Sequence, residues 1–198
     1  MNIAKTAIVY PNVEIGEDAT IEDYCIIGVP ISNQINLKTK IGSHCVIRSH
    51  TVIYAGNDIG DYFQTGNKAN IRELNQIGDH VSIGTGSVIE HHVIIQGGVR
   101  IHSQAFIPEY SELRKGCWIG PKAVLTNAKF PQSLAVKETL KGCVVEEAAK
   151  IGANSTLLPG VRVGKNSLVG AGSVVTHDVA DNQIVCGNPA VFLRKIHY

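Results

Sequence analysis

The chain has 198 residues, the size of one domain, so we expect residues 1–198 to fold as a single unit. Its formal charge of +1 offers no electrostatic footprint for nucleic acid or for an anionic membrane surface. The apolar residues are dispersed, and no run approaches the roughly 20 that span a bilayer. No long apolar segment of a secretory signal is visible, and the five cysteines lack metal-type spacing. We therefore expect a cytoplasmic protein without nucleic-acid or membrane partners.

Aliphatic residues recur at every sixth position from Ile41 to Leu125, and only Thr65 interrupts the series. A shorter copy of this series runs from Val145 to Val175. A helix repeats near 3.6 residues and a strand repeats at 2, so a period of six lets short strands all point the same residue inward. Small or turn-tolerant residues often follow the aliphatic one, which predicts tight corners. Hexapeptide repeats of this kind indicate a parallel β-helix, whose stacked units share one continuous core.

The phase of the repeat breaks in two places, after Ile27 and after Phe130. These breaks predict loops at residues 28–40 and 131–143. A loop extruded from a rigid scaffold is a usual place for binding residues. The end of the chain, residues 189–197, is predicted to form a short helix that caps the open end of the coil, as repeat folds require.

The repeat resembles that of the left-handed β-helix acyltransferases, also known as hexapeptide-repeat transferases. Their unit is an aliphatic residue, a small residue, two variable residues, another small residue and one more, and this pattern covers nearly the whole chain. The resemblance implies an all-β fold, a single-stranded left-handed parallel β-helix in which three hexapeptides form one triangular coil of 18 residues. The hand comes from the resemblance, because the period alone does not give it.

If a coil has 18 residues, residues 18 apart lie over one another, about 4.7–4.9 Å apart. His91 then lies at a corner between the carboxylates of Glu73 and Glu109, with Arg72 and Glu90 in the neighbouring column. An amine or hydroxyl nucleophile must lose a proton when it attacks a thioester. A histidine, with an unperturbed pKa near 6.5, can accept that proton at neutral pH. A carboxylate on the other ring nitrogen would fix the tautomer and stabilise the imidazolium.

The run from Ser87 to Ile94 resembles the catalytic segment of bacterial nucleotide-amino-sugar N-acetyltransferases. In those enzymes the first histidine of an Ile-Glu-His run is the general base, which implies this role for His91. The family often has a carboxylate at the next position, where this chain has His92. The partner that orients His91 is therefore open, and the candidates are Glu73, Glu90 and Glu109.

Residues 120–131 resemble the segment before the insertion in 3-amino-sugar acetyltransferases of the same group. In those proteins Asn and Glu side chains at the corner contact the sugar. The resemblance implies a nucleotide-sugar substrate, and the residues that it suggests for binding are Asn127, Glu73, Arg72, Asn67 and Glu90.

Family members are homotrimers that bind acetyl-CoA in a groove between coils of neighbouring subunits, so the resemblance implies both features here. Small corner residues let the cofactor approach the backbone, whose amides can also hold the oxyanion. A second family histidine contacts the thioester region of acetyl-CoA, and His102 is its match. The other implied cofactor residues are small corner residues and basic residues for the 3′-phosphate: Gly120, Ala153, Ala171, Lys165, Arg194 and Lys195.

The resemblance therefore implies an acetyl-CoA-dependent acetyltransferase. Its acceptor would be an amino group of a nucleotide-linked (dTDP or UDP) amino sugar used in surface-glycan, or lipopolysaccharide, biosynthesis. We expect direct transfer with His91 as the general base, because Cys117 occupies an inward position of the repeat and does not suit a covalent route. O-acetylation of a sugar or a small alcohol by the same site is the alternative.

A non-catalytic scaffold and a zinc carbonic anhydrase-like protein are alternatives from other classes. The anhydrase of this fold needs three converging histidines. His91 and His92 are adjacent and would diverge on a strand, while His44, His50 and His80 are expected at the surface. We therefore expect no metal site.

Overall fold

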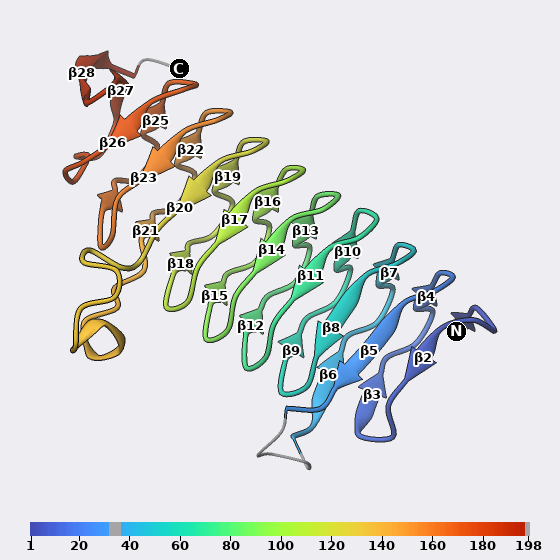
Figure 1. The fold of residues 1–198 in the computed structure, drawn as a ribbon. Helices are drawn as coiled ribbons and strands as arrows, with labels where there is room; N and C mark the ends of the chain where they lie inside the picture. Colours follow the sequence, from blue (N-terminus) through green and yellow to red (C-terminus); the bar gives the residue numbers. More distant parts are fainter. Residues whose placement is uncertain (32–36, 197–198) are drawn as a thin grey trace.

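The computed structural model describes residues 1–31 and 37–196, and it is an all-β parallel solenoid (Figure 1). Short strands wind from one end of the molecule to the other, and each pairs with the strand one coil further along. Gln64 pairs with Ser82, and Ser82 pairs with Arg100, which is a step of 18 residues per coil. The predicted all-β parallel helix with 18-residue coils is confirmed.

The strands form three sheets, which are the sides of the solenoid and which we name A, B and C. Sheet A contains β1 (Asn2–Ile3), β4 (Thr20–Ile21), β7 (Val46–Ile47), β10 (Gln64–Thr65), β13 (Ser82–Ile83), β16 (Arg100–Ile101), β19 (Trp118–Ile119), β22 (Lys150–Ile151), β25 (Leu168–Val169), β27 (Gln183–Gly187) and β28 (Ala190–Lys195). Sheet B contains β2 (Ile8–Val9), β5 (Ile26–Val29), β8 (Val52–Tyr54), β11 (Asn70–Ile71), β14 (Val88–Ile89), β17 (Phe106–Ile107), β20 (Val124–Leu125), β23 (Thr156–Leu157) and β26 (Val174–Val175). Sheet C contains β3 (Val13–Ile15), β6 (Thr39–Ile41), β9 (Asp58–Ile59), β12 (Gln76–Ile77), β15 (Ile94–Ile95), β18 (Glu112–Leu113), β21 (Val144–Val145) and β24 (Arg162–Val163).

The chain turns a corner between successive sheets. In one central coil the A–B corner is residues 84–86, the B–C corner is residues 90–92 and the C–A corner is residues 96–98, and we use these three names for the equivalent positions of every coil. The third corner residue of many coils has a positive φ, as in His92 at 56°. This left-handed backbone conformation turns the chain toward the next sheet.

The second residue of each two-residue strand points into the solenoid, and the first points out. Ile83, Ile89 and Ile95 are almost fully buried, and each contributes roughly 1.5–3 kcal/mol by leaving water. Thr65 replaces an aliphatic residue inside the core without leaving its hydroxyl unpaired. Its Oγ1 accepts the backbone N–H of Arg48 at 2.9 Å and lies 3.2 Å from the hydroxyl of Thr51.

Two coils are longer than the others. The first excursion lies between β5, which ends at Val29, and β6, which begins at Thr39, and residues 32–36 of the loop predicted at 28–40 lie outside the described part. The second excursion lies between Leu125 and Val144 and contains a short 3₁₀ helix, η1 (Val136–Glu138). It returns beside its own start, since Lys141 donates its backbone N–H to Asn127 O at 2.9 Å.

The prediction of a C-terminal helix within residues 189–197 is wrong. Residues Ala190–Lys195 form β28, which pairs antiparallel with β27 at the edge of sheet A. The apolar residues Val191, Phe192 and Leu193 are consecutive and exposed rather than spaced at helical intervals, so a helix would bury no continuous stripe. Pairing with β27 instead satisfies the backbone groups that face β27. Residue 197 lies outside the described part.

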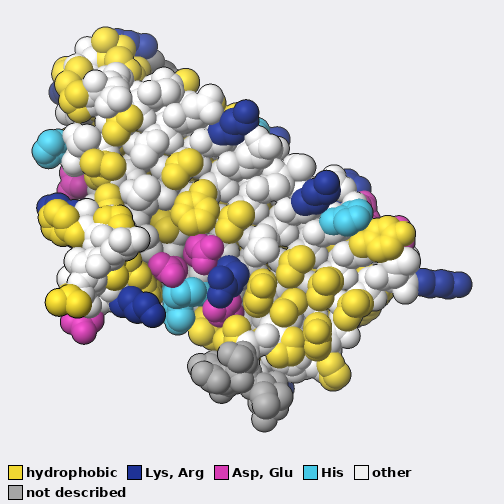
Figure 2. All heavy atoms as spheres, in the orientation of Figure 1, with side chains coloured by type: hydrophobic (Ala, Val, Ile, Leu, Met, Phe, Trp, Pro, Cys, Tyr) yellow, Lys and Arg dark blue, Asp and Glu magenta, His cyan; other side chains and the backbone are white. Residues whose placement is uncertain are grey.

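The outer face of sheet B is apolar, whereas sheets A and C carry charged residues such as Arg100 and Asp58 at outward positions. Figure 2 shows hydrophobic side chains gathered over β2, β5 and β8, and one compact group of acidic, basic and histidine side chains at the edge of the same face, near β15. In the described part of the chain, no helix is long and apolar enough to cross a bilayer. The outward residues of sheet B are mostly apolar, namely Ile8, Ile26, Val52, Val88, Phe106, Val124 and Val174, while Asn70 and Thr156 are polar.

Candidate active site

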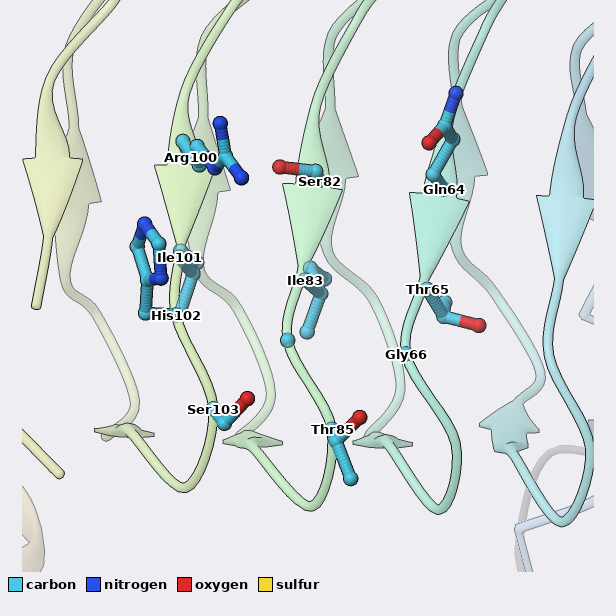
Figure 3. A pocket seen from close by; sticks show the side chains of 11 residues that line it. Gln64, Thr65, Gly66, Ser82, Ile83, Thr85, Arg100, Ile101, His102 and Ser103 are labelled. Atoms are coloured by element: carbon cyan, nitrogen blue, oxygen red, sulfur yellow. The ribbon is translucent and has the colours of Figure 1, made fainter. Parts of the chain in front are cut away.

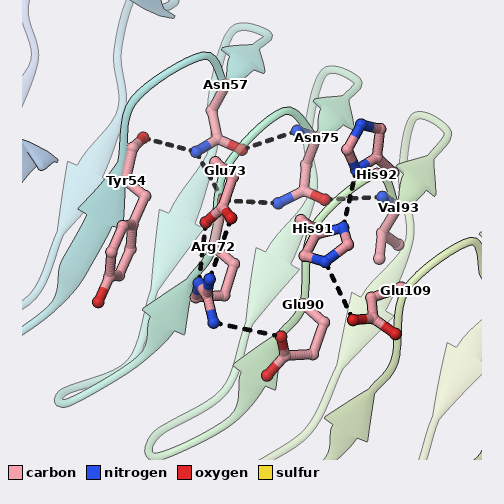
Figure 4. Close-up of polar contacts among 10 residues, drawn as sticks. All are labelled: Tyr54, Asn57, Arg72, Glu73, Asn75, Glu90, His91, His92, Val93 and Glu109. Carbon is pink, nitrogen blue, oxygen red and sulfur yellow. Dashed lines mark hydrogen bonds and ion pairs between the residues drawn. The ribbon is translucent and has the colours of Figure 1, made fainter. Parts of the chain in front are cut away.

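The B–C corner brings six of the predicted site residues together, and Figure 4 shows all of them except Asn127. Successive coils pair in register, with Ile71 opposite Ile89 and Ile89 opposite Ile107, so the corner residues that follow them also stack. The structure places in this group His91, Glu73, Glu109, Asn127, Arg72 and Glu90.

Glu109 is the carboxylate that contacts the ring of His91. Its Oε1 lies 3.0 Å from His91 Nε2, and its Oε2 accepts a hydrogen bond of 2.6 Å from Asn127 Nδ2. Both His91 and Glu109 are half-buried at the corner. A carboxylate held in this way orients the imidazole and stabilises its charged form, which is the arrangement that general-base catalysis uses.

Glu73 is engaged by Arg72 rather than by His91. Arg72 donates from Nε and Nη2 to the two oxygens of Glu73, at 2.8 and 3.0 Å, and its guanidinium lies 5.1 Å from the centre of the Tyr54 ring. Burial raises the pKa of the Glu73 carboxyl, but the hydrogen bonds and the charge of Arg72 outweigh it and hold that pKa below its usual value. Glu73 is therefore an ionised carboxylate that is paired with Arg72 and stabilises the inner side of the corner.

The charges at this corner do not balance. Three carboxylates lie here, those of Glu73, Glu90 and Glu109. The guanidinium of Arg72 faces two of them: it donates hydrogen bonds to Glu73, and its Nη1 lies 3.6 Å from Glu90 Oε2. With a neutral His91, the corner has an excess of negative charge. Such a site favours a cationic group on whatever binds beside the histidine.

Two buried asparagines tie these coils together, and the sequence-based prediction missed them. Asn75 Oδ1 accepts the backbone N–H of Val93 at 2.7 Å, and its Nδ2 donates to Arg72 O at 2.8 Å. Asn57 repeats the pattern one coil earlier and accepts the backbone N–H of Asn75 at 3.1 Å. The available signal was an amide in two successive coils at an inward position that elsewhere is small or β-branched.

His91 and His92 do not diverge, which corrects the expectation drawn from strand geometry. Both lie in the corner after β14 rather than on a strand, and His92 adopts a φ of 56°. Their Nδ1 atoms are 2.7 Å apart and their rings are perpendicular, with centroids 4.9 Å apart. The ring of Tyr110, one coil further along, packs against both of them.

His102 lies on a different corner from His91. It follows β16 at the A–B corner, where its ring packs against Trp118 at 4.7 Å and lines a pocket with residues of β10, β13 and β16 (Figure 3). Burial, and then the charge of Arg100, lowers the pKa of His102, so the ring is neutral at pH 7. Its Nε2 is buried and has no hydrogen-bond partner among residues 1–31 and 37–196.

The small residues predicted for cofactor binding also lie on the A–B corner, in successive coils: Gly120, Ala153 and Ala171. Gly120 is buried under the next coil, where an added Cβ would lie 2.6 Å from Ile151 O and 2.7 Å from Ala153 N. Close stacking therefore accounts for this glycine without a ligand. Asn67 belongs to the same corner and donates from Nδ2 to the hydroxyl of Ser49 at 2.7 Å.

The basic residues predicted for the 3′-phosphate lie elsewhere. Lys165 is at the C–A corner, exposed, with Nζ 3.7 Å from Glu147. Arg194 and Lys195 are exposed on β28. In one copy of the chain, the structure thus separates the predicted residues into the B–C corner, the A–B corner and the C-terminal region.

Three further histidines stack with tyrosines on other corners. The ring of Tyr62 lies between those of His44 and His80, with centroids 4.8 and 4.6 Å away, and His50 packs against Tyr24. Within the described residues, no group of three or more His, Cys, Asp or Glu side chains is arranged to hold a metal ion. Burial raises the pKa of the Cys117 thiol to about 12, which makes it a poor nucleophile.

Known proteins resemble this chain in sequence. The profile of a family described as bacterial transferase hexapeptide (six repeats) matches residues 142–177. The galactoside O-acetyltransferase of Lactococcus lactis is 40% identical over 82 residues, which cover 39% of this chain and 40% of that protein. The acyl-[acyl-carrier-protein]–UDP-N-acetylglucosamine O-acyltransferase of Campylobacter concisus is 27% identical over 99% of this chain and 74% of its own length.

A solved structure shares the fold. The UDP-N-acetylglucosamine O-acyltransferase of Moraxella catarrhalis superimposes with a TM-score of 0.53 at 21% identity, over 98% of this chain and 75% of that one. The chain spans less than two thirds of the length of the galactoside O-acetyltransferase. The fold is therefore shared with that solved structure, and the hexapeptide repeat is shared with the family profile over residues 142–177.

Proposed function

The chain belongs to the hexapeptide-repeat transferases, and on that premise we propose that it transfers an acetyl group from acetyl-CoA to an amine. The observation that carries the proposal is the contact of His91 with Glu109, 3.0 Å from nitrogen to oxygen, at a corner crowded with carboxylates. His91 acts as the general base and Glu109 orients it, an effect typically worth ~10²–10⁴ in rate. Transfer is direct, because the Cys117 thiol is buried and protonated.

The charge of the corner supports an amine rather than a hydroxyl as acceptor. Amines arrive largely as ammonium ions at neutral pH, and the excess of carboxylates over Arg72 attracts them. A neutral hydroxyl gains nothing from this field. O-acetylation is the second candidate, and the observation that favours it is the 40% identity to a galactoside O-acetyltransferase.

The acceptor amine is carried by a nucleotide-linked sugar in this proposal. The long loop between Leu125 and Val144 begins beside Asn127, and it exposes Lys129, Lys137 and Lys141. Lysines on such a loop suit a diphosphate, while the carboxylates at the corner suit the amino group. Arg72, Glu90 and Asn127 then contact the sugar between them. Use of this sugar in surface-glycan synthesis in the cytoplasm is part of the same proposal.

Acetyl-CoA binds between copies of the chain in a homotrimer. The A–B corner and the B–C corner flank the same apolar face, sheet B, and a large apolar face is a typical interaction surface. When three copies pack these faces around a threefold axis, the A–B corner of one copy meets the B–C corner of the next. His102, Gly120, Ala153, Ala171 and Asn67 of one copy then complete the site around His91 of its neighbour.

Release of free thiol from acetyl-CoA tests this function. We expect the purified chain to release thiol with nucleotide-linked amino sugars and not with the matching hydroxy sugars. The acetylated product should resist hydroxylamine, which cleaves esters and leaves amides intact. His91→Ala should lose the activity, and His80→Ala, at the C–A corner, should keep it. Full turnover by His91→Ala, or product cleaved by hydroxylamine, would contradict the proposal.

A further inference from the structure

His91 and His92 face each other through the same ring atom. Their Nδ1 atoms are 2.7 Å apart, so one carries the proton and the other the lone pair. On the other side of the His91 ring, Nε2 lies 3.0 Å from Glu109 Oε1. An ionised carboxylate only accepts hydrogen bonds, so neutral His91 carries its proton on Nε2. Its Nδ1 is then the acceptor, and the Nδ1–H of His92 is the donor.

This arrangement leaves no ring nitrogen of His91 open to a substrate. One nitrogen is bonded to Glu109 and the other to His92, as Figure 4 shows for the three side chains in a row. The ring of His92 is exposed, and no residue in the described ranges forms a hydrogen bond with its Nε2. With the proton on Nδ1, this Nε2 holds the lone pair that faces solvent.

The row of Glu109, His91 and His92 is held in place by neighbouring side chains and by the backbone. Glu109 is fixed by Asn127, which donates to Oε2 at 2.6 Å, and the ring of Tyr110 packs against both histidines. The backbone of His92 is fixed too, since its N–H donates to Glu73 O at 3.3 Å and the next N–H, that of Val93, donates to Asn75. The contact between the two imidazoles is therefore a built feature of the corner.

We propose that His92 takes the proton of the acceptor and passes its own Nδ1 proton to His91. This inference rests on the proposed function and changes one step of it: His92 is the base that contacts the acceptor, and His91 holds the proton in the second position. The bound ammonium first releases one proton to solvent, and the free amine nitrogen then attacks the thioester carbon. The C–N bond forms, the carbonyl electrons move to the oxygen, and the new ammonium gives one proton to His92 Nε2. His92 Nδ1–H moves to His91 Nδ1, and the resulting imidazolium is stabilised by Glu109. The C–S bond then breaks, and the proton returns along the same path to the leaving coenzyme A thiolate.

Two substitutions at His92 separate proton transfer from positioning. His92→Asn keeps a donor near the position of Nδ1 and tolerates the positive φ, and His92→Gly removes the ring without backbone strain. We expect both variants to lose ~10²–10⁴ in kcat with little change in KM for acetyl-CoA. Added imidazole should restore turnover to His92→Gly and not to His92→Asn. Wild-type turnover by His92→Asn would overturn the relay.

The tautomers provide a readout that does not depend on activity. In wild-type protein with ¹⁵N-labelled histidine, NMR should show His91 protonated on Nε2 and His92 protonated on Nδ1. The opposite assignment for either ring would overturn the proposal, and this test holds even if a variant fails to fold. A wild-type protein that acetylates no amine would reject the proposed function. A wild-type protein that does, together with a fully active His92→Asn, would reject the relay alone.

Discussion

Asn127 donates a hydrogen bond of 2.6 Å to Glu109, the same carboxylate whose other oxygen contacts His91. Asn127 lies where the chain leaves the solenoid, and its carbonyl accepts the backbone N–H of Lys141, where the loop returns to the solenoid. The long loop and the histidine are thus connected through one carboxylate. A change in the loop that moves Asn127 will therefore also shift Glu109 and alter its contact with His91.

Asn127→Asp should lower activity while the protein stays folded. The new carboxylate would face Glu109 in place of a donor, and two like charges at this distance repel. Loss of a hydrogen bond to a charged group costs about 1.5–3 kcal/mol, so we expect kcat to fall roughly 10- to 100-fold. Steady-state thiol release measures this. Asn166→Asp, at the C–A corner, is the matched control, and an equal loss in both variants would contradict the prediction.

Glu109→Gln should reduce kcat more than it affects binding. The amide keeps the shape of the side chain but cannot stabilise an imidazolium at His91 through the 3.0 Å contact. We expect a loss of ~10²-fold in kcat, since general-base help is worth ~10²–10⁴. KM for acetyl-CoA should stay near its wild-type value.

Glu147→Gln is the control for Glu109→Gln, because Glu147 is an exposed carboxylate paired with Lys165 on another corner. It should leave both kinetic constants unchanged. A Glu109→Gln protein with wild-type kcat would show that another carboxylate orients His91.

The repeat predicts which residues stack at the candidate site because its geometry is periodic. Residues 18 apart must stack when every coil has the same length, so the column of Glu73, His91 and Glu109 follows from counting. Counting does not give side-chain rotamers, which is why the engagement of Glu73 by Arg72 and the contact of His91 with His92 were not foreseen. The expectation that His91 and His92 diverge assumed a strand, whereas both lie in the corner after β14, where the same count had placed His91.

The wrong prediction at the C-terminus and the separation of His102 and Asn67 from His91 within one chain have different physical origins. Residues 190–195 do not follow the hexapeptide repeat, so the pattern does not predict their conformation. They form a strand because β27, at the edge of sheet A, has unpaired backbone groups with which they form hydrogen bonds. The resemblance assigned His102 to acetyl-CoA and Asn67 to the sugar without saying on which corner each lies, because a corner can be identified from sequence only after the coil is divided into its three sides. Once it is divided, both residues fall on the A–B corner.

Glu73→Gln should destabilise the fold at neutral pH and less so in acid. The pKa of Glu73 is held below its usual value of 4.5, so the ionised carboxylate stabilises the folded state above that value. This contribution is lost as the pH falls through the lowered pKa of the folded protein. We expect the variant to be less stable by roughly 1.5–3 kcal/mol at pH 7.

Urea unfolding at pH 7 and at about pH 3 compares the Glu73→Gln variant with the wild type. The gap between the two midpoints should shrink at the lower pH. A gap that stays constant would show that lost packing, and not the charge of Glu73, is responsible.

Asn75→Val should lower the free energy of unfolding, because Asn75 is a buried side chain that links the backbones of neighbouring coils at the B–C corner. The variant leaves the buried N–H of Val93 without its acceptor, while the carbonyl of Arg72 loses one of its two donors and keeps the other, Asn57 Nδ2. An unsatisfied buried group costs about 1–3 kcal/mol and a lost hydrogen bond about 0.5–1.5 kcal/mol, so we expect a loss of roughly 2–4 kcal/mol in the free energy of unfolding. Asn70→Val is the matched control, because Asn70 Oδ1 is buried without a partner in the described part of the chain. A similar loss in both variants would contradict the role of the Asn75 bonds.

Phe106→Glu should dissociate the proposed trimer, because it places a charge at the centre of the apolar face of sheet B. Ile94→Glu, on the outer face of sheet C, is the matched control and should leave the assembly intact. Light scattering coupled to size-exclusion chromatography measures the mass of each. A wild-type protein that is monomeric at the concentrations used for turnover would contradict the assembly.

Mixing two inactive variants tests whether the site is shared between copies. His91→Ala lacks the B–C histidine and His102→Ala lacks the A–B histidine, which lie on different corners of one chain. When the two are unfolded together and refolded as mixed trimers, roughly a quarter of the sites should pair an intact His91 with an intact His102 of the neighbour. Activity should return to about that fraction of wild type, because each such site is complete. If the mixture stays as inactive as its components while mixed trimers form, both histidines must act from the same chain or His102 must act elsewhere.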